Sequence, residues 1–478
     1  MNRKQAAIIF CILMAISSSV MFFSSCSNKL SEGFVIFTQV NGKTQDINNL
    51  KTDSWRYNLQ SRIAVIDPSD PQKTFRILTP DFYTALSPRI SFDGKFMLFS
   101  ARKNENDTWQ IWEMNLENLQ VRPITREKDN CIDPAYLPGR QIVFTRIMVN
   151  APAQAGHELI TCNTDGTKLQ KITYDFREYS SSTVLKDGRV LAISRQTYPD
   201  LKKAVLMILR PDGTKANLFY NGPEENTLIG PACEMSDGKI LFIETGINNK
   251  SAGELISIRY NRPLHSRISF SSGIKGSFQS VTSMNSGKLL VSFRPSSAGK
   301  YSLYEFDPEK MIMGDPIYSS SEFDALEAVV VENRERPKKL PSEVDPGVKT
   351  GLLLCQDINF TGIPSEVKTI SSLKADRIEI IGADSSLGII QSEKDGSFYL
   401  KVIADTPFRI RTLDEKGNIL NETCDWIYLR PNERRGCIGC HEDHEMVPEN
   451  RLPLAVKRDP FLIPVHKTKL EEKVIELE

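Results

Sequence analysis

A short apolar run that follows a tight turn recurs along the first part of the chain. Residues 93–99, Asp-Gly-Lys-Phe-Met-Leu-Phe, are one such unit. The turn glycines of the six units are Gly33, Gly94, Gly139, Gly188, Gly238 and Gly287. The last five are 45, 49, 50 and 49 residues apart, and 61 residues separate the first two, which indicates an insertion. Glycine supplies the positive φ that a tight hairpin turn needs, and each apolar run is long enough for one buried strand.

Further strand-like segments follow the turns. Second strands are predicted at residues 109–115, 157–161 and 204–209, and short closing segments at residues 76–79, 122–125 and 170–173. Several strands repeated at an interval of this size are typical of the blades of a β-propeller. An array of β-sandwiches is the alternative, but six evenly spaced units favour closure into a ring. We therefore predict an all-β protein with a six-bladed β-propeller over residues 26–331, completed by a strand at residues 324–331.

A second domain is predicted after a linker. Residues 332–349 are charged and proline-rich and lack an apolar period, so they indicate a domain boundary. Beyond them, strands are predicted at residues 350–357, 377–382, 397–403 and 407–414. These strands indicate a small antiparallel β-sandwich within residues 350–478. Cys355 and Cys424 are candidates for a bridge across it, although one sequence does not establish such a pairing.

The candidate chemistry lies near the end of this second domain. Cys437, Cys440 and His441 form the C-x-x-C-H pattern that attaches a c-type haem. Two thiols at this spacing can each form a thioether to a haem vinyl group, and the histidine that follows is then held beneath the iron as an axial ligand. Residues 426–429 alternate apolar and polar side chains, so a last strand is predicted to support the motif.

Two other uses of the same residues remain open. Zinc can be held by Cys437, Cys440 and two of the histidines, which are His441, His444 and His466, because C-x-x-C is also a zinc-ligand spacing. A redox or structural disulfide across the C-x-x-C is the other alternative.

The groups around a haem decide what it does. His466 is far enough along the chain to fold back as a sixth iron ligand, in which case the haem only relays electrons. An empty sixth position lets small molecules bind the iron, which permits catalysis or sensing. Arg430, Arg434 and Arg435 flank the motif and are candidates to bind the haem propionates through charge-assisted hydrogen bonds. A solvated basic run is the alternative for these arginines.

The N-terminus indicates export. Arg3 and Lys4 precede an apolar run over residues 6–23, which is typical of a secretory signal. The run ends in a segment that resembles a bacterial lipobox, so residues 1–25 are predicted to be a lipoprotein signal peptide and Cys26 the lipidated residue. An uncleaved membrane helix is the alternative. By resemblance to lipoprotein sorting patterns, Ser27 and Asn28 favour the periplasmic face of the outer membrane within the cell envelope.

Composition narrows the range of partners. The chain has 478 residues, with 60 Lys and Arg against 60 Asp and Glu, so no basic field attracts nucleic acid. Nine cysteines are few for this length and do not indicate a disulfide scaffold. The expected partners are a lipid anchor in a bacterial membrane and a redox partner protein.

Three stretches together resemble a known family. Residues 350–357, 395–417 and 426–443, which follow a propeller similar to the TolB-type repeat, resemble the hydrazine synthase alpha subunit and its relatives. In that family the motif histidine can serve a zinc ion in place of the iron, which gives His441 a second candidate role. Hydrazine synthesis uses more than one haem centre, whereas only 37 residues follow His441 here and no second C-x-x-C-H is present. The resemblance therefore does not imply that reaction for this chain.

The sequence as a whole predicts an exported lipoprotein with one covalent haem c, acting in periplasmic redox chemistry or electron transfer. Whether the haem is an oxidoreductase centre is left open, and sensing is a weaker hypothesis. The alternative function is that of a non-enzymatic binding or scaffold lipoprotein whose propeller docks a partner and whose C-x-x-C holds zinc or a disulfide.

Overall fold

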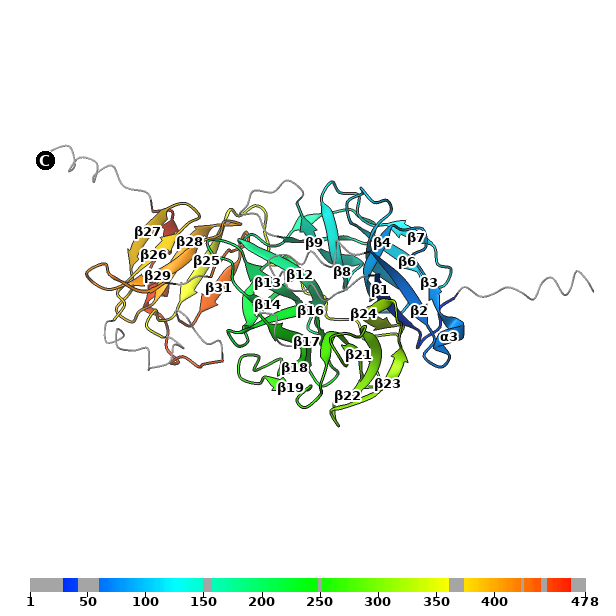
Figure 1. Cartoon of the computed structure of the whole chain (residues 1–478). Helices are drawn as coiled ribbons and strands as arrows, with labels where there is room; N and C mark the ends of the chain where they lie inside the picture. The colour runs from blue at the N-terminus through cyan, green and yellow to red at the C-terminus, as the bar shows by residue number, and fades with distance from the viewer. Residues whose placement is uncertain are drawn as a thin grey trace, which may run out of the picture.

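The computed structural model describes residues 29–41, 60–148, 157–247, 252–360, 374–422, 425–439 and 445–465. Within these ranges the strands form eight four-stranded sheets. Six sheets surround an axis as propeller blades, and two form a sandwich beside them (Figure 1). The predicted all-β class, with a six-bladed propeller followed by a small sandwich, is confirmed.

Each blade has one innermost strand and three strands further out. The first three blades, from the innermost strand outward, are β24 (Phe323–Val330), β1 (Val35–Asn41), β2 (Ser61–Ile66) and β3 (Arg76–Ile77); β4 (Thr84–Ile90), β5 (Phe96–Arg102), β6 (Gln110–Asn115) and β7 (Val121–Pro123); and β8 (Asn130–Leu137), β9 (Gln141–Ile147), β10 (Glu158–Asn163) and β11 (Gln170–Lys171). The last three are β12 (Arg177–Val184), β13 (Val190–Gln196), β14 (Ala204–Leu209) and β15 (Asn217–Tyr220); β16 (Asn226–Glu234), β17 (Lys239–Gly246), β18 (Glu254–Arg259) and β19 (Ile268–Ser269); and β20 (Ser277–Ser283), β21 (Leu289–Arg294), β22 (Ser302–Asp307) and β23 (Ile312–Tyr318). A single helical turn, α3 (Pro71–Thr74), precedes β3.

The ring closes because one blade combines strands from the beginning and the end of the propeller sequence. The innermost strands contact one another in the order β4, β8, β12, β16, β20 and β24, and β24 contacts β4 again. Strand β24 also pairs antiparallel with β1, so a late strand completes the first blade. The prediction that residues 324–331 complete the ring is confirmed, since β24 covers nearly the same residues.

The five glycine turns after Gly33 each join the innermost strand of a blade to the next strand outward, whereas Gly33 precedes β1, whose innermost neighbour is β24. All six turn glycines have positive φ, from +68° at Gly94 to +92° at Gly33, as the turn prediction requires. The apolar runs after the turns are the second strands, such as β5 and β13. The innermost strands that precede the turns were not recognised in the sequence, because their apolar pattern is interrupted, as in the Ser180-Ser-Ser-Thr183 stretch of β12.

The interruptions are β-bulges that line the centre of the ring. The backbone φ is positive at Ser87 (+57°), Asp133 (+52°), Ser181 (+52°) and Glu327 (+52°), where non-glycine residues seldom adopt such values. The Asp133 carboxylate accepts hydrogen bonds from Ser87 Oγ at 3.0 Å and Ser181 N at 3.0 Å. Because these three residues belong to consecutive blades, the carboxylate ties neighbouring blades together around the axis.

The linker predicted at residues 332–349 lies against the propeller. Its backbone amides donate from Arg334 to Phe92 O at 2.8 Å and from Lys338 to Lys186 O at 3.1 Å. Further along, Glu343 N donates to Asp212 Oδ2 at 2.7 Å. The linker therefore follows a fixed path over successive blade turns before the sandwich begins.

The sandwich consists of one antiparallel and one mixed sheet. The antiparallel sheet contains, in spatial order, β27 (Ser386–Gln391), β26 (Arg377–Ile381), β29 (Arg409–Leu413) and β30 (Ile419–Glu422). The mixed sheet contains β31 (Arg434–Cys437), β25 (Thr350–Cys355), β28 (Phe398–Ile403) and β32 (Phe461–Ile463). In the mixed sheet only β25 and β28 pair antiparallel, while β31 and β32 add in parallel at the two edges. Antiparallel pairing was predicted throughout, so these two edges differ from the expectation.

The strand predicted at residues 426–429 does not form. Ile427 makes only an isolated bridge to Phe408. The alternation in this segment arises because Trp426 and Tyr428 are buried against the propeller, at 4% and 1% exposure, rather than within a sheet. The strand that carries the motif is instead β31, which follows the segment.

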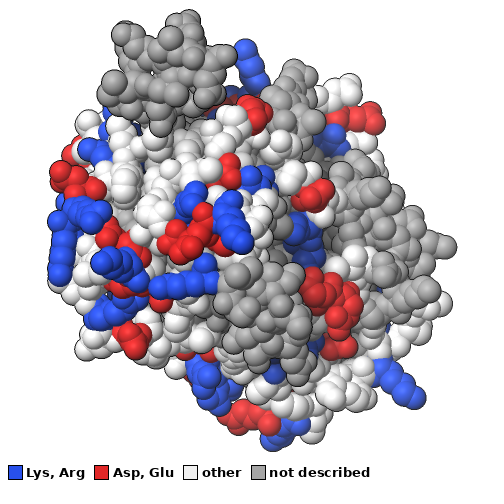
Figure 2. Space-filling view, turned by 90° about the vertical axis from the view of Figure 1, so that its left-hand side faces the viewer, with Lys and Arg blue, Asp and Glu red and all other residues white. Residues whose placement is uncertain are grey.

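The described surface at the sandwich end of the molecule carries mixed charge. Figure 2 views the end of the molecule formed by the sandwich, and its described part carries interspersed acidic and basic side chains without a broad field of one sign. In the portion of the chain that the structure describes, no helix is long and apolar enough to cross a membrane.

Candidate functional site

The segment that leads to the cysteine motif docks on the propeller. Trp426 Nε1 donates a hydrogen bond to Tyr198 O at 2.7 Å, and its ring meets Phe176 edge to face at 4.7 Å between centroids. The hydroxyl of Tyr428 lies 3.1 Å from Ile172 O and 3.2 Å from Gly213 O. The ring of Tyr428 packs in the apolar core of blades three and four. The two aromatic rings therefore fix the start of the segment against the propeller.

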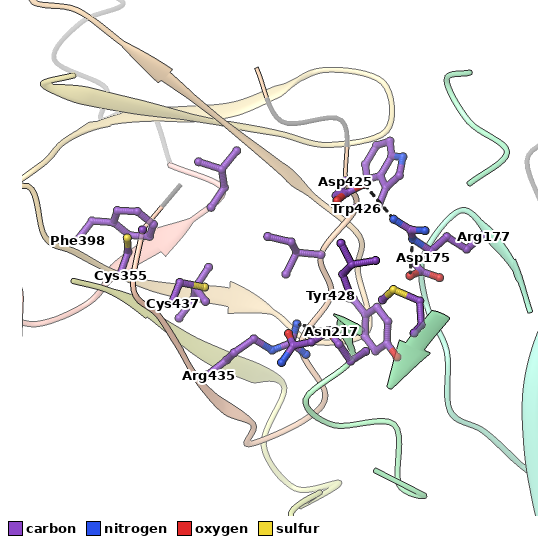
Figure 3. A pocket seen from close by; sticks show the side chains of 17 residues that line it. Asp175, Arg177, Asn217, Cys355, Phe398, Asp425, Trp426, Tyr428, Arg435 and Cys437 are labelled. Atoms are coloured by element: carbon purple, nitrogen blue, oxygen red, sulfur yellow. Dashed lines mark hydrogen bonds and ion pairs between the residues drawn. The ribbon is translucent and has the colours of Figure 1, made fainter. Parts of the chain in front are cut away.

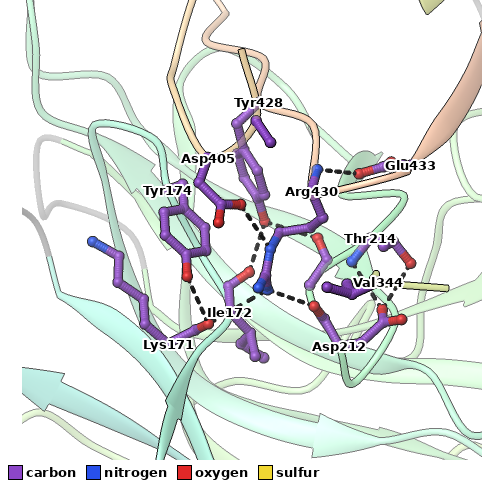
Figure 4. A network of polar contacts seen from close by, with 12 residues as sticks. Lys171, Ile172, Tyr174, Asp212, Thr214, Val344, Asp405, Tyr428, Arg430 and Glu433 are labelled. Carbon is purple, nitrogen blue, oxygen red and sulfur yellow. Dashed lines mark hydrogen bonds and ion pairs between the residues drawn. The ribbon is translucent and has the colours of Figure 1, made fainter. Parts of the chain in front are cut away.

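Arg430 forms the centre of the polar contacts at this junction (Figure 4). Its side chain is 3% exposed, and Nε lies 2.8 Å from Asp405 Oδ1. Its Nη1 donates to Asp212 O at 2.5 Å, and the guanidinium lies over the Tyr174 ring at 4.7 Å. Burial raises the pKa of Asp405, and the positive charge of Arg430 opposes that rise. A buried arginine with these partners holds the two domains in one orientation.

Glu433 and Arg435 continue the attachment. Glu433 is fully buried, and its Oε1 accepts from Lys215 N at 2.8 Å and from Arg435 Nη2 at 2.7 Å. Arg435 also donates from Nη1 to Ala216 O at 3.2 Å. The guanidinium of Arg435 is thus directed at Glu433 and blade four, whereas Arg434 is exposed. The propionate-binding role predicted for these two arginines stays a prediction.

Cys437 is the last residue of β31 and faces a second cysteine. The parallel pairing of β31 with β25 sets Cys437 opposite Cys355 in register. Cys355 is 1% exposed, and Cys437 is half-buried. Just beyond, a Cβ at Gly439 would lie 1.9 Å from Phe360 O, so the turn after Cys437 approaches another backbone too closely for any residue but glycine.

The remaining predicted site residues, which comprise the candidate haem or zinc ligands, the lipidation site and the second cysteine of the candidate bridge, lie outside the described residues. They are Cys26, Cys424, Cys440, His441, His444 and His466. Among the residues that are described, no group of three or more His, Cys, Asp or Glu side chains is arranged to hold a metal ion. The zinc alternative therefore stays untested.

A cavity of about 210 Å³ lies between blade four and the sandwich (Figure 3). Apolar side chains of both domains line it, and they include Met207, Leu218, Leu353, Phe398, Ile410 and Ile427. Cys355 and Cys437 lie on one side in this view, and Asp175, Arg177 and Asp425 lie on the other. The walls of the cavity are therefore mostly apolar, with the two thiols on one side and the charged side chains of Asp175, Arg177 and Asp425 on the other.

The charged group contains polar atoms without partners. Asp175 Oδ2 accepts from the Tyr179 hydroxyl at 2.8 Å and lies 3.7 Å from Arg177 Nε. Arg177 Nη2 donates to Asp425 Oδ1 at 3.0 Å, which joins the two domains. Asp175 Oδ1 and Arg177 Nε are both buried and make no hydrogen bond. Burial raises the pKa of Asp175, and Arg177 opposes the rise.

The cavity fits part of a haem. At about 210 Å³ it is smaller than typical small-molecule pockets, which begin at roughly 300 Å³, so it can take an edge of a porphyrin but not the whole ring. One motif thiol stands in its wall, and apolar side chains of the kind that line cofactor sites surround it. The residues present are thus consistent with a partly enclosed haem c.

Sequence reasoning missed the cavity residues contributed by the propeller. Asp175 and Arg177 lie far from the motif along the chain, and no local pattern distinguishes them from other charged residues near strand ends. Cys355 was assigned to a strand, but its position opposite Cys437 depends on a parallel pairing that no turn signal indicates.

Fold and site define a β-propeller protein with a cysteine-bearing β-sandwich docked on its fourth blade. The family described as hydrazine synthase alpha subunit middle domain matches residues 364–442. Hydrazine synthase subunit alpha of Kuenenia stuttgartiensis is 21% identical over 510 residues, which cover 80% of this chain and 62% of that protein. The chain is therefore a hydrazine synthase alpha-like protein, although it spans less than two thirds of the length of that relative.

Solved structures resemble the chain in fold. The hydrazine synthase structure of Kuenenia stuttgartiensis matches with a TM-score of 0.75 at 18% identity, over 90% of this chain and 72% of that one. TolB from Acinetobacter baumannii matches with a TM-score of 0.45 at 12% identity, over 63% of this chain and 66% of that one. The first match extends the likeness over both domains.

Proposed function

We propose that this protein is an exported lipoprotein, anchored through Cys26 at the periplasmic face of the outer membrane, that carries one covalent haem c for redox chemistry or electron transfer. The observation that supports this most is the position of Cys437, the first thiol of the C-x-x-C-H, in the wall of a cavity between the two domains. When bound, a haem c supplies an iron that exchanges single electrons.

Each part of the motif has a defined role in this proposal. Cys437 and Cys440 form the thioethers, and His441 is the axial ligand or serves a zinc ion. Trp426, Tyr428 and Arg430 hold the preceding segment on the propeller, which gives the attachment strand a rigid support. His466 is the candidate for a sixth ligand, and its presence or absence at the iron would separate an electron relay from a reactive centre.

Hydrazine synthesis is not assigned to this protein. The chain spans 62% of the length of the curated relative, so the activity of that whole protein is not carried over to it. Nothing in the comparisons favours the alternative of a scaffold lipoprotein with zinc or a disulfide at the C-x-x-C.

Covalent haem attachment is the direct test. The protein should be produced together with a haem c maturation system, denatured and examined for visible absorbance and added mass. We expect the wild type to stay coloured with the mass of one haem, and Cys437→Ala with Cys440→Ala to be colourless. Cys355→Ala is the control, because its thiol lies outside the motif, and it should keep the haem. A colourless wild type would refute the proposal.

Two glycines beside Cys437 test whether the loop geometry matters for attachment. A Cβ at Gly439 meets Phe360 O at 1.9 Å, whereas a Cβ at Gly436 meets nothing within 4 Å. We expect Gly439→Ala to lower the haem yield several-fold because the turn between the two thiols must open, while Gly436→Ala keeps the yield. Equal yields would show that the close approach of Phe360 is irrelevant to maturation.

Membrane attachment is tested separately. Cys26→Ser should move the protein from the membrane fraction to the soluble fraction, because it removes the acyl chains that make anchoring stable. Retention of Cys26→Ser in the membrane would favour the uncleaved helix instead.

A further inference from the structure

We infer that a pocket in blade one of the propeller binds a small molecule that carries a carboxylate next to a flat apolar group. Blade one lies on the side of the propeller away from the sandwich (Figure 1), and none of the described residues that line the pocket belongs to the haem motif. The inference goes beyond the proposed function and does not depend on the presence of haem.

The pocket lies where strands of blade one begin or end. Its volume is about 410 Å³, which falls within the roughly 300–1,000 Å³ of typical small-molecule sites. Asn41 ends β1, Ser61 begins β2 and Phe323 begins β24, and all three residues line the pocket. Phe82 and Tyr83, which precede β4, complete this part of the wall. A compact organic molecule therefore fits the pocket.

Arg62 supplies the charge of the pocket. Among the described lining residues, it is the only Lys, Arg, Asp or Glu. Its Nε donates to Gln39 Oε1 at 2.9 Å, and the guanidinium lies over the Phe323 ring at 4.4 Å. Gln39 is 1% exposed and donates from Nε2 to the Tyr318 hydroxyl at 2.5 Å. Neutral groups therefore hold the guanidinium in one orientation.

The two terminal nitrogens of Arg62 have no acceptor. Within the part of the chain that the structure describes, no carboxylate forms an ion pair with Arg62, and its Nη1 and Nη2 make no hydrogen bond. These two nitrogens are also not sealed off by protein atoms. A guanidinium presents paired N–H groups that match the two oxygens of a carboxylate. A carboxylate can therefore bind Arg62 without displacing an existing partner.

Aromatic rings beside Arg62 favour a ligand with a flat apolar part. Phe82 packs edge to face against Trp112 at 5.0 Å between centroids, which restrains its ring. The Tyr83 hydroxyl donates to Glu105 Oε1 at 3.0 Å, so that polar group already has a partner. Aromatic pairs contribute beyond the apolar area that they bury. A ring next to the carboxylate therefore suits this wall of the pocket.

A phosphate group fits the pocket less well. Phosphate carries more negative charge than a carboxylate, and its sites use a helix N-terminus or several charge-assisted donors. Arg62 is the only cation among the described lining residues, since Arg102 contacts the Tyr83 ring but does not line the pocket. One guanidinium matches the single charge of a carboxylate.

Benzoate is a suitable probe, and benzamide is its neutral counterpart of similar shape. The affinity of each for the full-length protein at neutral pH can be measured by ligand-observed NMR titration. We expect wild type to bind benzoate at least about tenfold more tightly than benzamide, because only benzoate forms the charged pair with Arg62. Arg62→Gln should weaken benzoate binding by at least about tenfold and leave benzamide binding nearly unchanged.

Arg294→Gln is the matched control. Arg294 also lies over an aromatic ring, that of Tyr301 at 4.6 Å, but it does not line the pocket. The Arg294→Gln protein should bind benzoate as wild type does. Arg62→Lys keeps a cation without the paired donors, so it should recover part of the benzoate affinity, which separates loss of binding from loss of fold.

Several results would overturn the inference. Benzoate that fails to bind wild type, binds no more tightly than benzamide, or binds Arg62→Gln as well as wild type would show that Arg62 does not hold a carboxylate. Displacement of benzoate by an equal concentration of inorganic phosphate would assign the pocket to phosphates instead. Benzoate binding that appears only after Asp46 and Asp53 are both changed to Asn would mean that the chain itself supplies the carboxylate.

Discussion

Asp175 is a fully buried carboxyl group at the junction of the two domains. Its ordinary pKa of 3.8 is raised by burial, while Arg177 and the Tyr179 hydroxyl pull the value back. Because the rise prevails, the ionised form is less stable in the folded protein than in the unfolded chain. The ionised Asp175 carboxylate therefore lowers the stability of the folded protein at neutral pH.

Replacement of Asp175 by Asn should change how stability depends on pH. Between the unfolded value of 3.8 and the raised folded value, the native state binds more protons than the unfolded chain, so stability falls as pH rises through that window. Asp175→Asn removes this fall, and the variant should gain stability relative to wild type as the pH increases. Urea midpoints of both proteins without haem, from about pH 4 to 8, measure the difference. A difference that does not vary with pH would contradict the raised pKa.

Single residues also show where sequence reasoning is limited. The positive φ of the six turn glycines could be predicted because glycine is the residue that tolerates it. The sequence could not predict the same positive φ at Ser87, Asp133, Ser181 and Glu327. Hydrogen bonds between side chains and backbone of different blades stabilise it, and those partners are distant in sequence. Spacing in the sequence singled out Cys437, which lines the cavity, whereas Asp175 and Arg177 join the cavity only through the docking of two domains.

Among the elements, the linker has a more specific role than a spacer. Its carbonyl at Lys338 approaches the turn of blade four so closely that a Cβ at Gly188 would lie 2.0 Å away. The equivalent turn of blade five is open, because a Cβ at Gly238 meets nothing within 4 Å. The turns at Gly188 and Gly238 therefore differ in that the linker packs closely on the first and not on the second.

This pair of glycines separates backbone strain from linker packing. Both have positive φ, +90° at Gly188 and +81° at Gly238, so alanine at either position should cost about 1–2 kcal/mol of stability through strain. Gly188→Ala should cost more, because Lys338 O must move as well. It should also speed tryptic cleavage after Lys338 and Lys339, which Gly238→Ala leaves unchanged. Equal midpoints and equal cleavage rates would mean that the linker does not depend on this contact.

The elements differ in how well they could be predicted. Outer blade strands such as β14 are continuous apolar runs, and the predicted and observed limits coincide at Ala204–Leu209. The innermost strands other than β24 were missed because their bulges break the alternation. Residues 426–429 were wrongly predicted as a strand because burial against another domain produces the same alternation as burial in a sheet.

At the scale of the whole molecule, the candidate cofactor site is made by the contact between two domains. The cavity has walls from blade four and from the sandwich, so its shape depends on their relative orientation. Arg430 fixes that orientation through Asp212 O and the Tyr174 ring, and Tyr428 adds its hydroxyl contacts to the same blade. We therefore expect the two domains to unfold as one cooperative unit.

Loss of Arg430 should uncouple the domains. Arg430→Leu removes the cation that faces the Asp405 carboxylate and the donor to Asp212 O, which should cost about 3–5 kcal/mol and separate one urea transition into two. Arg451→Gln is the matched control, because Arg451 binds Asp395 at 2.8 Å inside the sandwich and makes no contact of this kind with the propeller among the described residues. Arg451→Gln should weaken the sandwich, so the urea midpoint falls while the protein still unfolds in a single transition. If Arg430→Leu also unfolds in one step, the remaining aromatic contacts are sufficient to couple the domains, and the cavity does not depend on this arginine.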